Sequence, residues 1–592
     1  MATPTSSPLD GAGRSRWFAV FFWFVALAPM LCYWWWDGRP IAVAEPPSAQ
    51  VPCVSFAPYQ DDQSPFDEDL MLSPAQIDRD LARLESLTRC VRTYSVNHGL
   101  EAVPEIARAR GMTVMLGAWI GRKRAKNERE LATVIDLANR YPETVSAVVV
   151  GNEVLLRREQ PPAALAAMIE RVRKAVHVPV TYADVWEFWK RYPDVARAVD
   201  FVTIHTLPYW EDDPKPIDEA VAHVVEIWRM MSETFPDKRV FIGEAGWPSA
   251  GRMREGARPG VVNQARFVRE LMAAAERAGI GLNLIESFDQ PWKRRLEGTV
   301  GGHWGLLDAE RAAKFPLFGP VSDDPCWTTK AGFTTVLSLI LLLPTLMTRR
   351  LSASGWLVIA LGASAAATLL VVGVYDGLIA ARTVYDWLVL CLRALCAVAS
   401  AVLVFDACAR SGFGADRENV VCPLSMEAWI AALRRGRLPD SAWRPAALGL
   451  VRAVSLFSAA ASTLCLVFDP RYRDFPSALY AIPAIAFLLL AIVRRRTARH
   501  GVSAISLPTL AEERLLATVL AAGGLVVAVQ EGIDNHQALG WTAMALVFAA
   551  AVVVDRMQVH EKMENGKTRP RKEASACDSP LEPSRLPVAD ES

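Results

Sequence analysis

The chain has 592 residues, of which 52% are hydrophobic, and it carries equal numbers of basic and acidic residues, 64 of each. This length exceeds that of one ordinary domain, and the hydrophobic fraction indicates that part of the chain lies in a membrane. The balanced charge excludes a strongly basic protein, so no nucleic-acid partner is predicted.

The first predicted element is a transmembrane helix over residues 17–36, WFAVFFWFVALAPMLCYWWW, which contain no charged side chain. About twenty apolar residues are needed for a helix to cross the hydrocarbon core of a bilayer. A cleaved signal peptide is the alternative, and IAVAEPP at 41–47 offers a weak cleavage site. The run is longer and more aromatic than a typical signal core. An anchor is therefore favoured, with a cytoplasmic N-terminus at 1–16 and a linker at 37–51.

Residues 52–320 mix polar and apolar side chains as a soluble domain does. The first amphipathic segment begins at Ser73, an N-cap that is followed by a proline at the first helical position. Such segments alternate with strand-like runs at 54–59, 91–96, 113–120, 145–150, 180–185, 201–205, 239–243 and 281–286. About eight βα units predict a (β/α)8 TIM barrel, an α/β fold. A doubly wound sheet is the alternative, but no glycine-rich phosphate loop follows the first strand.

Two glutamates are expected at the C-terminal ends of barrel strands, where catalytic residues of this fold lie. Glu153 follows the fourth strand in VVVGNEV, and Glu244 ends the seventh strand in VFIGEAGWPS. Paired carboxylates suggest glycoside chemistry, in which one protonates the leaving oxygen and the other attacks the sugar or activates water. A separation of about 5 Å would predict a covalent glycosyl intermediate and retained configuration. Surface or structural glutamates are the alternative, which two distinct motifs disfavour.

These motifs resemble glycoside hydrolase family 17, the β-1,3-glucanase family, over about residues 54–307. They are RTYSV at 92–96, GNEV at 151–154, GEAGWPS at 243–249, IESFDQPWK at 285–293 and HWGLLD at 303–308. The chain is especially similar to membrane-anchored bacterial members that act as β-glucan transglycosylases. The resemblance implies that Glu153 is the general acid/base, Glu244 the nucleophile, and Asn152 a ligand of the sugar beside the scissile bond. Burial and the charge of Glu244 are expected to raise the pKa of Glu153.

Further residues are predicted to bind substrate. Glu286 and Lys293 match supporting residues of the family, although an ion pair that braces the eighth strand is equally consistent. Gln290 replaces an acidic residue that plant glucanases typically have at this position. The preferred length of the substrate chain is therefore left open. Aromatic rings can stack on sugar rings, and Trp210 and Trp304 belong to the aromatic group expected at the mouth. The predicted substrate-binding set is Tyr59, Arg92, Tyr94, Trp119, Asn152, Trp186, His205, Tyr209, Trp247, Glu286, Asp289, Trp292 and Lys293.

No metal site or cofactor is predicted, because the eight histidines show no paired ligand spacing. His98, His205 and His303 are interpreted as polar groups near the sugar site. Cys53 and Cys90 precede neighbouring strands at the same end of the barrel. An oxidising outer compartment would allow a disulfide between them, and two free thiols are the alternative.

Residues 331–557 are predicted to form an all-α domain of seven transmembrane spans. The apolar runs lie at 333–347, 356–374, 387–404, 447–468, 479–493, 516–529 and 541–554. Arginines before the first span and in alternate loops lie on the same side of the membrane as the basic C-terminal tail. Because basic residues are enriched in cytoplasmic loops, that side is predicted to be cytoplasmic. The barrel is therefore expected on the outer side, and residues 558–592 in a disordered cytoplasmic tail. The resemblance to bacterial members implies that the protein lies in the bacterial inner membrane with its barrel in the periplasm. Arg393, near the middle of a span, is a functional candidate or a partner of Asp376 or Asp386.

A covalent glucosyl-enzyme can pass its sugar to water or to another sugar hydroxyl. The membrane anchor and the resemblance favour transfer, which predicts a retaining β-1,3-glucan transglycosylase. The resemblance also implies its product, branched or cyclic β-(1→3),(1→6)-glucan. Its expected partners are β-1,3-glucan or its oligosaccharides and membrane lipid, and a separate glucan synthase stays open. An endo-1,3-β-glucanase is the alternative, and a non-catalytic glucan exporter or sensor is disfavoured by the two glutamates. A processive synthase is also disfavoured, because no cytoplasmic domain is large enough to bind a nucleotide sugar.

Overall fold

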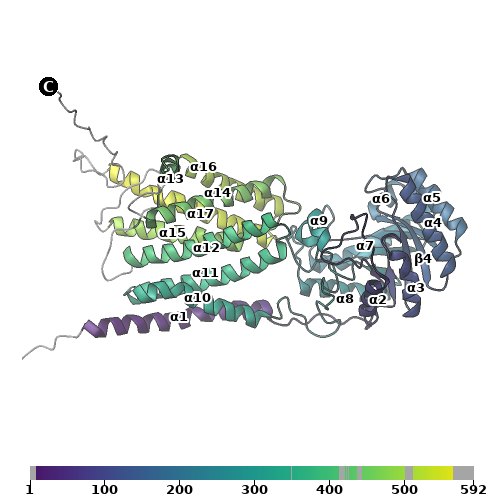
Figure 1. The fold of residues 1–592 in the computed structure, drawn as a ribbon, viewed down its shortest axis with the longest axis horizontal. Helices are drawn as coiled ribbons and strands as arrows, with labels where there is room; N and C mark the ends of the chain where they lie inside the picture. The colour runs from purple at the N-terminus through teal and green to yellow at the C-terminus, as the bar shows by residue number, and fades with distance from the viewer. Residues whose placement is uncertain are drawn as a thin grey trace, which may run out of the picture.

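The structure is a computed structural model that describes residues 8–348, 350–411, 421, 423–424, 426–436, 443–499 and 511–564. It has two parts, a barrel of strands and helices and a bundle of long helices, which lie end to end (Figure 1). The chain starts in the bundle with α1, Pro8–Gly38, forms the barrel, and then returns to the bundle. The expected tail is helical as far as Glu564, and its remaining residues lie outside the described ones.

The barrel is closed by eight parallel strands in chain order, which confirms the predicted TIM barrel. Val54 pairs with Leu284, so the first strand closes on the last. The strands begin where the apolar runs begin, because their side chains fill the barrel and its contact with the helices. They are β1 Val54–Ser55, β2 Cys90–Arg92, β3 Thr113–Ala118, β4 Val145–Asn152, β5 Val180–Val185, β6 Val202–His205, β7 Val240–Ala245 and β8 Gly281–Leu284.

Helices surround the barrel as the amphipathic segments predict. In α2 the Ser73 side chain accepts a hydrogen bond from the backbone N–H of Gln76 at 3.2 Å, which is the predicted N-cap. The helices are α2 Pro74–Leu84, α3 Val103–Ala109, α4 Arg124–Arg140, α5 Pro162–Ala175, α6 Trp186–Arg191, α7 Ile217–Thr234 and α8 Val261–Ala278. Three short 3₁₀ helices also occur, η1 Leu100–Ala102, η2 Pro193–Arg197 and η3 Pro291–Lys293. After β8, η3 leads into α9, Arg294–Gly301, which lies between the barrel and the bundle (Figure 1).

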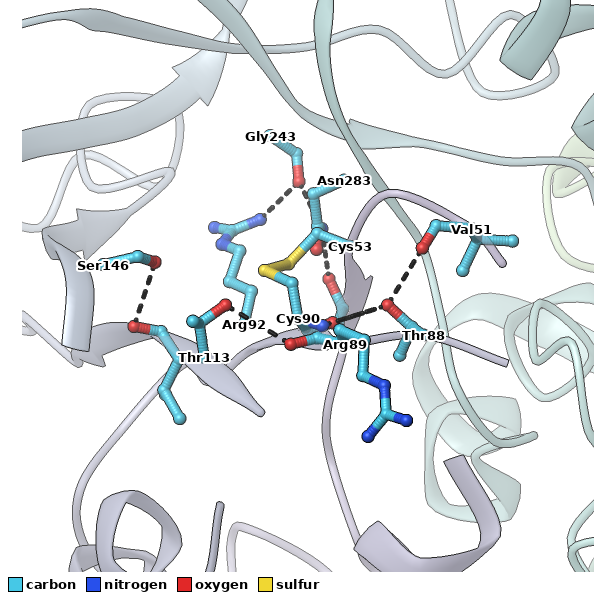
Figure 2. The surroundings of a disulfide bond; sticks show 12 residues. Val51, Cys53, Thr88, Arg89, Cys90, Arg92, Thr113, Ser146, Gly243 and Asn283 are labelled. Atoms are coloured by element: carbon cyan, nitrogen blue, oxygen red, sulfur yellow. Dashed lines mark hydrogen bonds between the residues drawn. A yellow bond between two sulfur atoms is a disulfide. The ribbon is translucent and has the colours of Figure 1, made fainter. Parts of the chain in front are cut away.

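A disulfide joins Cys53 and Cys90 at the N-terminal ends of β1 and β2 (Figure 2). Beside it, the Thr88 hydroxyl donates to the carbonyl of Val51 at 3.0 Å. Both cysteines pack with Met115 and other apolar side chains that close this end of the barrel. The alternative of two free thiols is thereby settled in favour of the bond, at the end of the barrel opposite Glu153 and Glu244.

The bundle contains the helices α10 Trp327–Thr348, α11 Ala353–Ala380, α12 Val384–Ser411, α13 Met426–Arg434, α14 Trp443–Phe468, α15 Ser477–Arg499, α16 Ala511–Glu531 and α17 His536–Glu564. Within the described ranges, α1, α10, α11, α12, α14, α15 and α17 are long and apolar enough to cross a membrane. One of the eight expected spans, 516–529, lies in α16 but is not among these candidates. Its uncharged stretch between Arg514 and Glu531 is short, and α16 packs against α14 and α17.

Arg393 has different partners from those expected. Its Nε donates to the Tyr480 hydroxyl at 3.0 Å, and another of its nitrogens lies 3.3 Å from Ser462 Oγ. Asp386 instead accepts from backbone N–H groups at the start of α12. Neutral hydroxyls from α14 and α15 therefore solvate this arginine inside the bundle.

Candidate active site

The structure brings Glu153, His205 and Glu244 together at the C-terminal ends of β4, β6 and β7. His205 Nδ1 lies 3.0 Å from Glu153 Oε1, and His205 Nε2 lies 3.6 Å from Glu244 Oε1. The carboxylate oxygens of the two glutamates come within 4.8 Å of each other. Glu244 and His205 are buried, whereas the side chain of Glu153 keeps 23% exposure. The imidazole thus lies between two carboxylates, one of which is accessible.

The GNEV turn has an unusual backbone that explains its glycine. Gly151 has φ +90°, and a Cβ there would lie 2.7 Å from a methyl carbon of Val154. Glu153 itself has φ +54°, a left-handed conformation that costs free energy for a residue other than glycine. The turn is held because the Glu153 N–H donates to the Ala183 carbonyl at 2.8 Å. This local strain is consistent with a turn shaped to place one carboxylate.

Arg92 connects the other members of the site. Its guanidinium is fully buried and donates to Glu244 Oε1 at 3.0 Å, to Asn152 Oδ1 at 2.5 Å and to the Gly243 carbonyl at 2.8 Å. Figure 2 shows the bond to Gly243. Such charge-assisted bonds from one rigid fork fix both position and orientation. Arg92 therefore holds Glu244 and Asn152 in a defined relation to each other.

The pKa of Glu153 departs from the expectation. Burial raises it, but the hydrogen bond and positive charge of His205, with the charges of Arg157 and Arg92, lower the pKa of Glu153 below its ordinary value. The expected rise is therefore wrong for the substrate-free site. The expectation took no account of His205, which is remote from Glu153 in the sequence but adjacent to it in space.

Glu286 and Lys293 form an ion pair near the catalytic glutamates. Lys293 Nζ donates to Glu286 Oε1 at 2.8 Å, and Glu286 is fully buried. Burial raises the pKa of Glu286 to about 7, against the lowering effect of Lys293. Glu297 on α9 belongs to the same electrostatic cluster, since burial and then the charges of Glu153 and Glu244 raise its pKa, although Lys293 lowers it. The sequence did not indicate Glu297, because it follows the motif on a short helix without a pattern of its own.

Several predicted sugar-binding rings remain accessible. Trp119 is 38% exposed, and the Arg157 guanidinium lies 4.3 Å from its ring centre. Trp292 is half-buried with Tyr59 and Phe66 edge-on to it at 6.4 and 5.6 Å. Tyr94 lies 4.9 Å from the guanidinium of Arg92. Trp186, just after β5, is also half-buried.

Other predicted residues lie in the interior. Tyr209 and Trp247 are fully buried, and their polar tips donate to the backbone carbonyls of Arg252 and Arg258. Their rings therefore pack in the core beneath the site. Asp289 pairs with Lys314 at 2.7 Å and with His303 at 3.3 Å, so it braces the loop after β8.

The remaining polar predictions have similar internal partners. Gln290 is buried and donates to the Ala57 carbonyl at 2.7 Å. His98 Nδ1 lies 2.9 Å from the Leu70 carbonyl. Trp304 is buried, and its carbonyl accepts from the Glu286 N–H at 3.2 Å. These groups support the loops around the site.

Two buried carboxylates that sequence reasoning missed support the site from behind. Glu130 on α4 accepts hydrogen bonds from the Ser95 hydroxyl and from the backbone N–H of Val96 and Trp119. Burial raises the pKa of Glu130 to about 7, and these hydrogen bonds oppose the rise. Asp184 accepts from the backbone N–H of Leu155 at 3.2 Å and so caps the turn after Glu153. Neither carboxylate lies in a sequence motif, because each acts through contacts across the fold.

Glu153, His205 and Glu244 also meet the distance criterion for a three-ligand metal site, the one such group in the described part of the chain. Their arrangement does not suit a cation, however. Arg92 already neutralises Glu244 at 3.0 Å and would repel a metal ion. His205 directs one ring nitrogen to each carboxylate, which is the geometry of a hydrogen-bonded chain.

A TIM barrel with close carboxylates at the ends of β4 and β7 defines a glycosidase-like site. Residues 53–305 match the family described as the BtgE/BtgC glycoside hydrolase domain. The glucan 1,3-beta-glucosidase of Arthroderma benhamiae is 27% identical over 265 residues, which are 41% of this chain and 83% of that protein. The glucan 1,3-beta-glucosidase of Saccharomyces cerevisiae is 25% identical over 269 residues, which are 41% of this chain and 85% of that protein. Over residues 53–305 the chain therefore resembles glycoside hydrolases of this family, and the protein is a glycoside hydrolase-like enzyme.

A similar solved structure is the glycoside hydrolase family 17 β-1,3-glucanosyltransferase of Rhizomucor miehei. It is 26% identical with a TM-score of 0.40, and the match covers 46% of this chain and 98% of that protein.

Proposed function

We propose that the barrel is a retaining β-1,3-glucan transglycosylase in which Glu244 is the nucleophile and Glu153 the general acid/base. The curated relatives are named glucan 1,3-beta-glucosidases, which supports action on β-1,3-glucan. The observation that carries the finer proposal is the approach of the two carboxylates to within 4.8 Å. Retaining glycosidases hold these groups about 5 Å apart, whereas inverting ones leave room for a water at roughly 6.5–9.5 Å.

In the first step, Glu244 attacks the anomeric carbon and forms a glucosyl ester. The glycosidic C–O bond breaks, and a proton from Glu153 goes to the leaving oxygen. Arg92 keeps the attacking carboxylate in position, because it donates to Glu244 at 3.0 Å. Asn152, held by the same arginine, is placed to bind a hydroxyl of the sugar that reacts.

The second step reverses the roles. Glu153, now ionised, takes a proton from the acceptor hydroxyl, whose oxygen attacks the anomeric carbon while the ester bond to Glu244 breaks. The proton taken from the acceptor restores the acid form of Glu153 for the next cycle, and His205, at 3.0 Å, holds its carboxyl group in position. Water as acceptor gives hydrolysis, and a sugar hydroxyl gives transfer.

Substrate binding is assigned to the accessible rings and to unpaired polar atoms near them. Trp119 and Trp292 offer ring faces on different loops of the catalytic face. Trp186 Nε1 and Glu286 Oε2 are buried and have no hydrogen-bond partner within the described ranges. Because buried polar atoms are costly when unpaired, these two are suited to sugar hydroxyls. The loops that carry them belong to β3, β5 and β8.

The membrane-spanning helices support transfer over hydrolysis. An enzyme held at the bacterial inner membrane with its barrel in the periplasm would meet glucan where a separate synthase releases it. Lipid contact follows from the seven apolar helices. Branched or cyclic β-(1→3),(1→6)-glucan is the product that we propose. Hydrolysis, as by an endo-1,3-β-glucanase, is the second candidate, because the curated relatives carry the names of hydrolases.

The test uses the full chain in detergent micelles with a linear β-1,3-gluco-oligosaccharide. Products are followed by mass spectrometry, and their linkages are read by NMR. Products longer than the input, with a new β-1,6 signal, are expected from the wild type and should be absent with Glu244→Gln. Only shorter products would make the protein a hydrolase. No product of either kind would refute the proposal.

A further inference from the structure

The membrane bundle is not a distant tether, because its loops contact the catalytic face of the barrel. Arg252, in the loop after β7, is buried and donates to the carbonyl of Pro470 and to the carboxylate of Glu531. The neighbouring Met253 N–H donates to Gln537 Oε1 at 2.7 Å. Pro470 lies between α14 and α15, and Glu531 ends α16. Two loops of the bundle therefore hold the loop that follows the strand of Glu244.

Helix α9 lies between the bundle and the barrel (Figure 1). It follows Lys293, the partner of Glu286, and carries Glu297. On the bundle side, the Thr299 hydroxyl donates to Asp474 Oδ2 at 2.6 Å. Gly298 comes so close that a Cβ there would lie 2.6 Å from the carbonyl oxygen of Tyr472. The segment 469–476, which we name the α14–α15 loop, is thus packed directly on this edge of the site.

A row of aromatic rings runs from the site to this loop. Trp304, whose carbonyl bonds the Glu286 N–H, stacks on Trp210 at 6.3 Å with an interplanar angle of 21°. Trp210 in turn meets Tyr472 edge-on at 5.9 Å. Burial decreases along the row, since Trp304 is buried, Trp210 is half-buried and Tyr472 is 41% exposed. The exposed end of the row belongs to the bundle.

We propose that Trp210 and Tyr472 form a sugar-binding subsite that the barrel and the membrane bundle share. This inference rests on the proposed function and adds that the bundle contributes to recognition of the glucan chain. The partly exposed Tyr472 presents a ring and a hydroxyl, which suit a pyranose ring. The half-buried Trp210 lies edge-on to Tyr472, with Trp304 and the Arg254 guanidinium, 5.6 Å from its ring centre, against its own ring. The subsite lies beyond the catalytic groups along the row. It therefore contacts long chains, whereas short oligosaccharides that fill only the central positions do not reach it.

The test measures binding to the full chain in nanodiscs, with Glu244→Gln as the common background so that no turnover occurs. Dissociation constants for a linear β-1,3-linked trisaccharide and a decasaccharide are measured by calorimetry. Tyr472→Ala should weaken decasaccharide binding about three- to tenfold and leave the trisaccharide unchanged. Tyr472→Phe, which keeps the ring, should stay within about twofold of the background protein. Tyr385→Ala is the matched control, because Tyr385 is 73% exposed at the start of α12 and lies outside the row.

Equal dissociation constants with and without Tyr472→Ala would overturn the shared subsite. A uniform loss for both oligosaccharides would also overturn it, because it would show that Tyr472 only supports the fold. Failure of the proposed function has a different signature. It would appear as absence of turnover in the wild type, while the length-dependent effect of Tyr472→Ala on binding could still be measured.

Discussion

Replacement of Arg92 is the substitution whose effect the geometry defines most completely. Arg92→Met keeps an apolar stem but removes the guanidinium from Glu244, Asn152 and the Gly243 carbonyl. Breaking a buried ion pair costs about 3–5 kcal/mol, because the remaining charge is left without a partner. In a domain of this size, that loss should lower Tm by about 6–20 °C. Activity should fall at least about 100-fold, the usual effect of losing one preorganised donor at a reacting group.

Arg92→Lys refines the prediction. The lysine keeps the positive charge, but one ammonium group cannot reproduce the fork that reaches both Glu244 and Asn152. We expect kcat/KM about tenfold below wild type and a smaller loss of Tm than with methionine. The assay is the initial rate of product release from a β-1,3-gluco-oligosaccharide, measured at a temperature where all variants are folded.

The matched control is Arg269→Met on α8. Arg269 is also fully buried, and it donates to the carbonyls of Pro316 at 2.8 Å and Gly319 at 2.9 Å, away from the glutamates. It should lower Tm without lowering kcat/KM per folded molecule. The reasoning is refuted if Arg92→Met retains wild-type kcat/KM, or if Arg269→Met loses as much activity as Arg92→Met.

Three further predictions concern the framework of the site. Replacing Cys53 and Cys90 by serine should cost about 4 kcal/mol of unfolding free energy in chemical denaturation, because the bond closes a loop with a sequence separation of 37; an unchanged midpoint would contradict this. The raised pKa of Glu130, about 7 against 4.5, means that its protonated form stabilises the fold fully below pH 4.5 and that this stabilisation is lost as pH rises through 7. Between pH 4.5 and 8, Glu130→Gln should therefore lose less unfolding free energy than the wild type, by up to about 3 kcal/mol, and its Tm should fall less. Parallel pH profiles of variant and wild type would exclude the effect. Gly151→Ala, with its contact at 2.7 Å, should lower kcat/KM about tenfold or more, whereas Gly111→Ala, which has φ +65° and open space, should affect only stability.

The barrel could be predicted because its signals are local. Valine-rich runs bounded by polar residues gave strand positions close to the observed ones, and Ser73 with Pro74 marked the start of α2. Glu153 and Glu244 were found because they end such runs. The bundle followed from apolar length alone, which is also why α16 was taken for a full span although its apolar stretch is short.

The electrostatics of the site could not be predicted in the same way. The pKa of Glu153 depends on His205, which is close only because β4 and β6 share the barrel. Glu130 and Asp184 act on loops that begin elsewhere in the chain, so no motif contains them with their partners. Tyr209 and Trp247 belong to aromatic motifs, but whether a ring faces a ligand or the core depends on its neighbours in space.

The most direct test of the account is to trap the covalent intermediate. The full chain would be incubated with an activated 2-deoxy-2-fluoro-glucoside, whose fluorine slows hydrolysis of the ester, and then digested for peptide mass spectrometry. The account predicts one added glucosyl unit on Glu244, no label with Glu244→Gln, and release of the label by a β-1,3-gluco-oligosaccharide acceptor. A label on another carboxylate, or turnover with inverted configuration at the anomeric carbon, would contradict the assignment of Glu153 and Glu244.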